Sequence, residues 1–293
     1  MTGASPSLRH HAEQLAATLP PLLVEARRVA ATVAQGVHGR RRVGQGETFW
    51  QFRDYEFGDT PQLIDWRQSG KSDRVFVREL EWEAAQSIWI WRDLSASTDW
   101  RSSRALPSKR ERIDLLSLAL SVLLIGAGEH VALLGSPMRP VTGRSGLTRL
   151  TLSIERQEGD KADLPPRQPL PRHAHLVLIG DLLAPLEQIE QAIRDYAGHG
   201  IKGHILQVLD PAEEDLPYEG RVRFEGLESD ERWLLPRVES ARRTYRDRFE
   251  LHCEGLSTLA RAAGWSYARH RTDRPPQSAL LSLYTALSHN REL

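Results

Sequence analysis

The sequence has a single cysteine, Cys253, among its 293 residues. One cysteine forms no internal disulfide and cannot supply a cysteine-based zinc site. The most apolar stretch, residues 115–128, is interrupted by two serines and is shorter than the roughly 20 residues that a bilayer-spanning helix needs. The N-terminus lacks the apolar core of a secretory signal peptide. We therefore expect a cytoplasmic protein that does not insert into membranes.

A net charge of one sign is also missing. The 39 basic and 39 acidic residues cancel, so no overall field draws the protein to nucleic acid or to anionic lipid. Locally, residues 1–45 hold six arginines and two glutamates, which leaves a phosphate-binding module open as a minor alternative. We favour a solvated basic segment there, because most charge runs of this kind lie on solvent-exposed loops.

Hydrophobic residues make up 40% of the chain and charged residues 27%, which is typical of globular proteins. From residue 86 onward, short apolar runs alternate with segments of helical periodicity. The runs are residues 88–91, 131–134, 176–179, 205–209 and 265–268. Several of these runs lack polar alternation, which is typical of parallel strands covered on both faces. The alternation predicts an α/β fold with a doubly wound, mainly parallel open sheet.

The remaining stretches have other patterns. Apolar periodicity predicts two short helices within residues 7–35, separated at Pro20 and Pro21. Residues 221–237 predict a β-hairpin inserted near an edge of the sheet. We divide the chain into an N-terminal helical extension at 1–45, an aromatic-rich β/loop segment packed on the core at 46–85, and an α/β domain at 86–293.

Polar residues directly follow two of the predicted strands. Asp93, Ser95 and Ser97 come after the run at 88–91, and Asp181 comes after a later run. Because ligands gather beyond the carboxyl ends of parallel strands, we expect these side chains to meet in a solvent-facing crevice. Carboxylate and hydroxyl oxygens suit a hard cation such as Mg²⁺. Alternatively, the first aspartate and serine cap the turn by hydrogen-bonding free backbone N–H groups.

The spacing Asp-x-Ser-x-Ser with a later Asp resembles the metal-ion-dependent adhesion site of von Willebrand factor A domains. Upstream, the string R-x-Y-x-x-G-D-x-x-x-x-I-D-W at 53–66 is similar to the signature of one bacterial branch, the domain of unknown function 58 family. The residues that carry it are Arg53, Tyr55, Gly58, Asp59, Asp65 and Trp66. The resemblance covers about residues 24–290. It implies a von Willebrand A-like fold and a MoxR-type AAA+ ATPase as partner, because family members are commonly encoded beside such ATPases.

The sequence departs from the von Willebrand A pattern at two points. The loop that should carry a metal-binding threonine, residues 158–163, has Asp160 and Asp163 but no threonine. Arg92 directly precedes the first aspartate, where its charge opposes a cation unless the alternation of the strand turns it away. For the upstream signature, we favour a structural role, because an arginine–aspartate pair with aromatic residues more often fixes an extension to a domain.

Two histidines at the start of a predicted strand, His173 and His175, have no identifiable third ligand. We expect both at the surface and not in a metal site.

The leading hypothesis is a non-catalytic protein-interaction adaptor for a MoxR-type AAA+ ATPase. In this hypothesis Mg²⁺ is bound by Asp93, Ser95, Ser97 and Asp181, and an acidic side chain of the partner completes its coordination shell. Because the sequence has no nucleophile–base pair and no cofactor motif, we expect no enzymatic activity. The alternative is a metal-dependent hydrolase that uses the same crevice, since a bound cation also activates water.

Overall fold

The structure is a computed structural model. It describes residues 21–38, 49–55, 64–71, 74–80, 87–157, 159, 161–227 and 231–289. The described residues form two compact units. Residues 36–85 belong to the smaller unit, and those before 36 and from 86 onward belong to the larger one. The helix near the N-terminus therefore folds with the α/β unit, and the smaller unit is inserted between this helix and the first strand of the larger unit.

The larger unit is built on a five-stranded parallel sheet in the order β4-β3-β5-β6-β9. The strands are β3 (Ser87–Arg92), β4 (His130–Leu133), β5 (His175–Gly180), β6 (Lys202–Leu209) and β9 (Ser266–Arg271). Taken in chain order, their arrangement is 2-1-3-4-5, one of the two common doubly wound orders. The α/β fold with a mainly parallel open sheet, predicted from the apolar runs, is confirmed.

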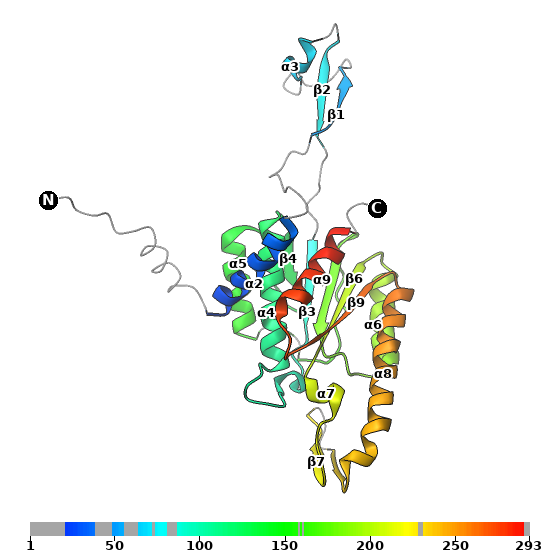
Figure 1. Cartoon of the computed structure of the whole chain (residues 1–293). Helices are drawn as coiled ribbons and strands as arrows, with labels where there is room; N and C mark the ends of the chain where they lie inside the picture. Colours follow the sequence, from blue (N-terminus) through cyan, green and yellow to red (C-terminus); the bar gives the residue numbers. More distant parts are fainter. Residues whose placement is uncertain are drawn as a thin grey trace, which may run out of the picture. The chain divides into compact units, whose positions relative to one another are not determined.

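Helices cover both faces of this sheet (Figure 1). The covering helices are α4 (Lys109–Gly126), α5 (Gly143–Glu155), α6 (Leu186–Ala197), α8 (Val238–Ala262) and α9 (Pro276–His289), and the short α7 (Pro211–Asp215) lies at the end of the sheet. On one face α4 contacts α5 and α9, and on the other α6 contacts α8. None of the helices in the described residues is long and apolar enough to cross a membrane.

The start of α4 shows how the sequence fixes a helix end. Ser108 accepts a hydrogen bond from the backbone N–H of Glu111, and the Glu111 carboxylate accepts one from the N–H of Ser108. This reciprocal capping box satisfies two backbone donors that the first turn leaves without partners. The cap places Lys109 as the first helical residue of α4.

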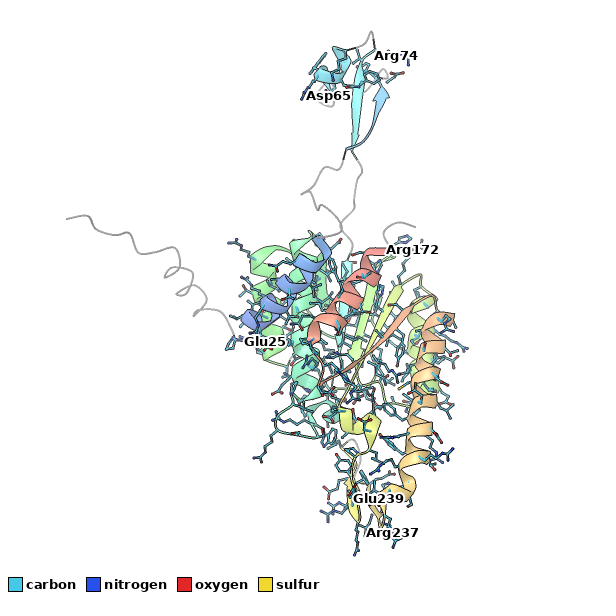
Figure 2. All side chains as sticks on the ribbon, in the orientation of Figure 1. Glu25, Asp65, Arg74, Arg172, Arg237 and Glu239 are labelled. Atoms are coloured by element: carbon cyan, nitrogen blue, oxygen red, sulfur yellow. The ribbon has the colours of Figure 1, made fainter. Side chains whose placement is uncertain are left out.

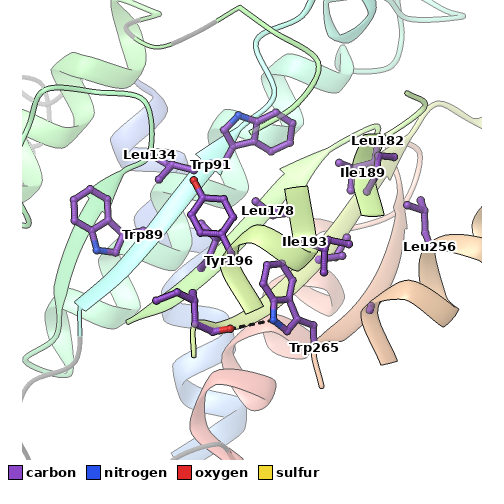
Figure 3. Close-up of a cluster of buried hydrophobic side chains, with 14 of the residues drawn as sticks. Trp89, Trp91, Leu134, Leu178, Leu182, Ile189, Ile193, Tyr196, Leu256 and Trp265 are labelled. Carbon is purple, nitrogen blue, oxygen red and sulfur yellow. Dashed lines mark hydrogen bonds between the residues drawn. The ribbon is translucent and has the colours of Figure 1, made fainter. Parts of the chain in front are cut away.

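The face under α6 and α8 is closed by aromatic side chains (Figure 3). Trp89 and Trp91 point to this face from β3, and Trp265 covers it at the far strand. The Trp265 indole donates to the carbonyl of Ile201 at 3.1 Å. A Cβ at Gly203 would lie 1.9 Å from the same indole, so this position of β6 has to be glycine for the ring to pack flat on the strand.

Two histidines form part of the interior. His175 is 2% exposed and stacks on His204, which is fully buried, with ring centroids 5.6 Å apart. A ring nitrogen of His204 also hydrogen-bonds the hydroxyl of Ser266 at 2.9 Å. The prediction of a surface position is confirmed for His173, which is exposed. It is wrong for His175, because the imidazole ring of His204 in β6 lies directly against it.

α2 (Pro21–His38) begins at the second of the two prolines. It buries an apolar stripe at helical spacing, made of Leu23, Ala26, Val29, Ala30 and Val33. The carboxylate of Glu25 acts on the charge of Arg112 in α4, so α2 lies on the α4 side of the sheet. The first of the two helices predicted in this region lies outside the described residues.

The predicted hairpin within 221–237 is present as β7 (Val222–Glu225) and β8 (Arg232–Leu235), which pair antiparallel. It leaves the chain between α7 and α8, at the end of the unit where the parallel strands finish (Figure 1). Arg237 and Glu239 lie at the same end (Figure 2). The Glu239 carboxylate accepts the backbone N–H of Gly220 at 2.7 Å, which ties the base of the hairpin to the start of α8.

The smaller unit has its own short sheet, in which β1 (Phe49–Asp54) pairs antiparallel with β2 (Phe76–Leu80). Between them, α3 (Trp66–Ser69) is capped by Asp65, whose carboxylate accepts the backbone N–H of Gln68 at 2.9 Å. The Asp65 N–H in turn donates to the carbonyl of Phe76. Asp65 therefore fixes the short helix against the second strand.

Candidate functional site at the carboxyl ends of the strands

The order of the sheet creates a crevice between β3 and β5. From β3 the chain continues to β4 on one side, and from β4 it returns to β5 on the other side of β3. Loops after the two strands therefore diverge, and ligands of doubly wound proteins bind at such switch points. Asp93 follows β3 directly, and Asp181 follows β5 directly. The two aspartates predicted to meet thus lie at the one place in this sheet where its topology opens a crevice.

Asp93 is held by backbone donors from both loops. Its Oδ1 accepts the N–H of Ser95 at 3.0 Å and the Ser95 hydroxyl at 2.5 Å. Its Oδ2 accepts the N–H of Asp181 at 3.3 Å. The turn-capping alternative is confirmed for Asp93, which closes the turn into the short 3₁₀ helix η2 (Ala96–Asp99). It is wrong for Ser95, whose side chain caps no backbone N–H and donates to Asp93 instead.

Asp181 continues the same network. Its Oδ2 accepts the Ser97 hydroxyl at 2.6 Å, and the hydroxyls of Ser95 and Ser97 are 3.1 Å apart. Asp93, Ser95, Ser97 and Asp181 are thus connected without a break. The structure brings together all four residues that the sequence singled out. It buries both carboxylates, with Asp93 0% and Asp181 3% exposed, so the expectation of a solvent-facing pair is wrong.

A glycine makes this close approach of the two loops sterically feasible. Gly180 is the last residue of β5, and a Cβ there would lie 2.6 Å from Cβ of Asp93 and 2.8 Å from its Oδ2. Contacts this short do not occur in folded proteins, so a side chain at 180 would push Asp93 out of its position. The crevice therefore depends on a residue with no side chain as well as on its polar ones.

Lys109 is a member of the crevice that the sequence did not reveal. Its ammonium donates to Oδ2 of Asp181 at 2.7 Å and also contacts the carboxylate of Glu213, and the lysine side chain is 1% exposed. Asp210, the residue directly after β6, caps α7 and accepts the N–H of Ser102 at 2.9 Å. The rule that found Asp93 and Asp181 also points to Asp210, since it follows a predicted strand in the same way.

Burial and neighbouring charge shift the pKa values of the crevice in opposite directions. Burial, and then the charge of Asp181, raises the pKa of Asp93 to about 7. Burial works against the charged form of Asp181, but the Lys109 ammonium outweighs it and lowers the pKa of Asp181. For Lys109, burial is likewise outweighed by Asp181 and Glu213, and its pKa is raised. Lys109 and Asp181 are therefore an ion pair at neutral pH.

Arg92 does not face the crevice. Its guanidinium contacts the Asp114 carboxylate of α4 at 2.5 Å, and both side chains are buried. Alternation along β3 therefore turns Arg92 to the α4 face, whereas Trp91 points to the opposite face. The charge that the sequence placed beside the proposed cation is neutralised within the core.

A resident divalent cation does not fit this arrangement of side chains. Mg²⁺ binds carboxylate oxygens at about 2.0–2.1 Å and keeps a full octahedral shell, whereas Oδ2 of Asp181 is already occupied by an ammonium and a hydroxyl. Among the described residues, no three His, Cys, Asp or Glu side chains are grouped to hold a metal ion. Asp160 of the loop that lacks threonine lies outside the described residues. Mg²⁺ at Asp93, Ser95, Ser97 and Asp181 stays a prediction.

The upstream signature residues are distributed over the smaller unit. Tyr55 is 38% exposed, and Trp66 is 69% exposed. Asp65 is buried and caps α3, as described above. Arg53 lies in β1, and Gly58 and Asp59 lie outside the described residues. For Asp65 the structural role is thus visible, whereas the indole of Trp66 is open to solvent.

Comparisons with known proteins give a family and no activity. The profile of a family described as "Protein of unknown function DUF58" matches residues 51–254. Uncharacterized proteins of Mycobacterium bovis and Mycobacterium tuberculosis are 26% identical over 231 residues, which cover 74% of this chain and 72% of theirs.

Two solved structures from Bacteroides also match, each over 70% of this chain and all of the other. One is described as an aerotolerance-related membrane protein of Bacteroides fragilis, with a TM-score of 0.43 and 16% identity. The other is the conserved hypothetical protein BatB of Bacteroides thetaiotaomicron, with a TM-score of 0.41 and 14% identity.

Proposed function

This chain belongs to the DUF58 family of proteins of unknown function, and we propose that it is a non-catalytic protein-interaction adaptor that works with a MoxR-type AAA+ ATPase. The partner class comes from the resemblance of the upstream signature to proteins encoded beside such ATPases. We place this role in the cytoplasm, in keeping with a single, buried cysteine. The resemblance also implies a von Willebrand A-like ancestry for the α/β unit.

The observation that carries the proposal is a set of exposed apolar side chains on the β7–β8 hairpin. Trp233 is 64% exposed, Leu227 50% and Leu234 49%. Exposed tryptophan and leucine side chains on a protruding element are typical of a protein-binding surface, and tryptophan contributes strongly where such surfaces bind. The hairpin leaves the sheet at its carboxyl end, the end that holds the crevice. A partner that binds there covers the rim of the crevice.

The chemistry of the crevice supports an adaptor better than an enzyme. The Ser97 hydroxyl donates to Oδ2 of Asp181. That carboxylate oxygen also accepts from the ammonium of Lys109, whose pKa is raised. A carboxylate neutralised by an ammonium is a weak base, and a protonated lysine cannot act as a base. A metal-dependent hydrolase remains the alternative, and the contact that would serve it is the Ser95 hydroxyl on the Asp93 carboxylate, which is 0% exposed. Mg²⁺ is no part of the docking that we propose.

Binding of a purified MoxR-type ATPase from the same genome tests the proposal. We expect wild-type protein to bind it in biolayer interferometry, and Trp233→Ala/Leu234→Ala to weaken binding by at least about 10-fold, as loss of an interface hot spot does. Trp66→Ala is the matched control, because it removes an equally exposed indole from the smaller unit. Loss of binding in Trp66→Ala alone would move the surface to that unit. No binding by the wild type would contradict the adaptor role for this partner.

A further inference from the structure

The crevice contains a positive charge of its own. Lys109, the first residue of α4, extends between the loops that follow β5 and β6. Its ammonium contacts the carboxylates of Asp181, in the loop after β5, and of Glu213, in α7. With 1% of the side chain exposed, the ammonium is shielded from water by these partners. It is the group that neutralises the buried acids.

The position of Lys109 in its helix supports this role. The N-terminus of a helix carries a partial positive charge, so a cation in the first turn is unfavourable there. Burial adds a second cost to the charged form. Both costs are met only because two carboxylates are aimed at the ammonium, one of them within 2.7 Å. The geometry of Asp181 and Glu213 therefore requires a cation at this point, and the chain supplies it covalently.

A metal ion and this ammonium are mutually exclusive. A divalent cation bound to Oδ2 of Asp181 at about 2.1 Å would stand within about 5 Å of the lysine nitrogen, in a buried setting that screens their repulsion poorly. At Asp93 both oxygens already accept hydrogen bonds, from the N–H and hydroxyl of Ser95 and from the N–H of Asp181. A cation that binds Oδ2 of Asp181 therefore has to displace Lys109.

We propose that the ammonium of Lys109 takes the place of the divalent cation in this crevice, so that the site is built and held without metal. The polar groups at the carboxyl ends of the strands then act as a structural clasp between α4 and the loops after β3, β5 and β6. A consequence for partner binding rests on the adaptor function proposed above. Binding of the partner should need no divalent cation and should be insensitive to EDTA.

Thermal melting of the full chain with and without about 5 mM MgCl₂ or MnCl₂ tests the replacement. We expect the wild-type melting temperature to be unchanged by either salt. Lys109→Ala should melt at a lower temperature and recover several degrees with metal, because the cation then enters the vacated place. The recovery should vanish in Lys109→Ala/Asp181→Asn. The control Lys161→Ala removes an exposed lysine and should melt like the wild type in every buffer.

The results that overturn the proposal are distinct. A metal-dependent rise in the melting temperature of the wild type that Asp181→Asn abolishes would mean that the ion displaces Lys109. If Lys109→Ala folds and its melting temperature does not change with metal, the Lys109 ammonium does not occupy the place of a metal ion. If Lys109→Ala fails to fold, calorimetric titration of the wild type with MnCl₂ decides, since saturable heat that depends on Asp181 contradicts the proposal. These readouts need no partner, so they stand apart from failure of the adaptor role.

Discussion

The ammonium of Lys109 lies 2.7 Å from Oδ2 of Asp181, and the two side chains are 1% and 4% exposed. The pair joins the first residue of α4 to the loop after β5, across the crevice that the strand order creates. A buried ion pair of this kind contributes little net stability compared with apolar packing, but removing one partner leaves the other charge buried alone. The relationship therefore predicts asymmetric effects of mutation.

Asp181→Ala should be strongly destabilising. It leaves the Lys109 ammonium buried with one carboxylate fewer, and we expect the free energy of unfolding to fall by about 3–5 kcal/mol in urea titrations. Glu250→Ala is the control, because the Glu250 side chain is 53% exposed and its carboxylate lies 2.9 Å from Arg269. That change should cost at most about 1 kcal/mol. Equal effects of the two substitutions would argue that the crevice pair is not buried in solution.

Gly180→Ala should disturb the crevice by overpacking. The new methyl group would lie 2.6 Å from Cβ of Asp93, and relief of this contact should cost about 1–3 kcal/mol of unfolding free energy. Gly126→Ala adds the same methyl group at the end of α4, where a Cβ meets nothing within 4 Å. We expect that control to leave stability unchanged or to raise it by up to about 1 kcal/mol. A neutral Gly180→Ala would contradict the close packing of the two loops.

Acid should destabilise the α/β unit through His204. Burial, followed by the charges of His175 and Lys202, lowers the pKa of His204 to about 3. The unfolded chain, with an ordinary pKa of about 6.5, binds a proton that the folded chain refuses. Stability is thus complete above pH 6.5 and decreases as the pH falls toward 3. We expect His204 to lower the free energy of unfolding by about 2 kcal/mol when the pH falls from 7 to 5.

The measurement is urea unfolding at pH 7 and pH 5 for the wild type and His204→Gln. The variant should lose about 2 kcal/mol less on acidification than the wild type. His199→Gln, at an exposed histidine, should keep the wild-type pH dependence. An unchanged dependence in His204→Gln would show that His204 is protonated in the folded protein. His270, whose pKa burial lowers to about 4, adds to the wild-type loss in the same direction.

Purified protein should hydrolyse no phosphate ester, carboxylic ester or nucleic acid in the presence of Mg²⁺ or Mn²⁺. The reason is that the carboxylate partner of the Ser97 hydroxyl, Asp181, is already paired with Lys109. The other serine–carboxylate pair, Ser95 with Asp93, is buried at an aspartate that is 0% exposed. Assays with chromogenic esters and labelled DNA measure this directly. Turnover that rises with added metal and disappears in Asp93→Ala would favour the hydrolase alternative.

The sequence predicts the sheet well because its strands are continuous apolar runs. No polar residue interrupts the runs from Ile88 to Trp91 and from Leu176 to Ile179. Such an uninterrupted apolar run is typical of a strand that is buried on both faces. The crevice aspartates follow from the same reasoning, since strand ends converge at one edge of a parallel sheet. Asp210 satisfies that rule too.

Lys109 and His175 show what local patterns leave out. A lysine after a capping serine is typical of a solvated helix start, and its burial here depends on Asp181 and Glu213, 72 and 104 residues further along the chain. The burial of His175 likewise depends on a ring 29 residues away. Both positions are decided by tertiary contacts, which periodicity and spacing do not record.

The most direct test of the metal-free crevice is a crystal structure of the wild-type chain grown with about 10 mM MnCl₂, with anomalous diffraction data. We expect the lysine nitrogen of residue 109 within hydrogen-bonding distance of Oδ2 of Asp181, as at 2.7 Å in the present structure, and no anomalous peak beside that oxygen. A manganese peak at about 2.0–2.6 Å from Asp181, the range of metal–oxygen bonds for such hard cations, with Lys109 turned away, would contradict the account.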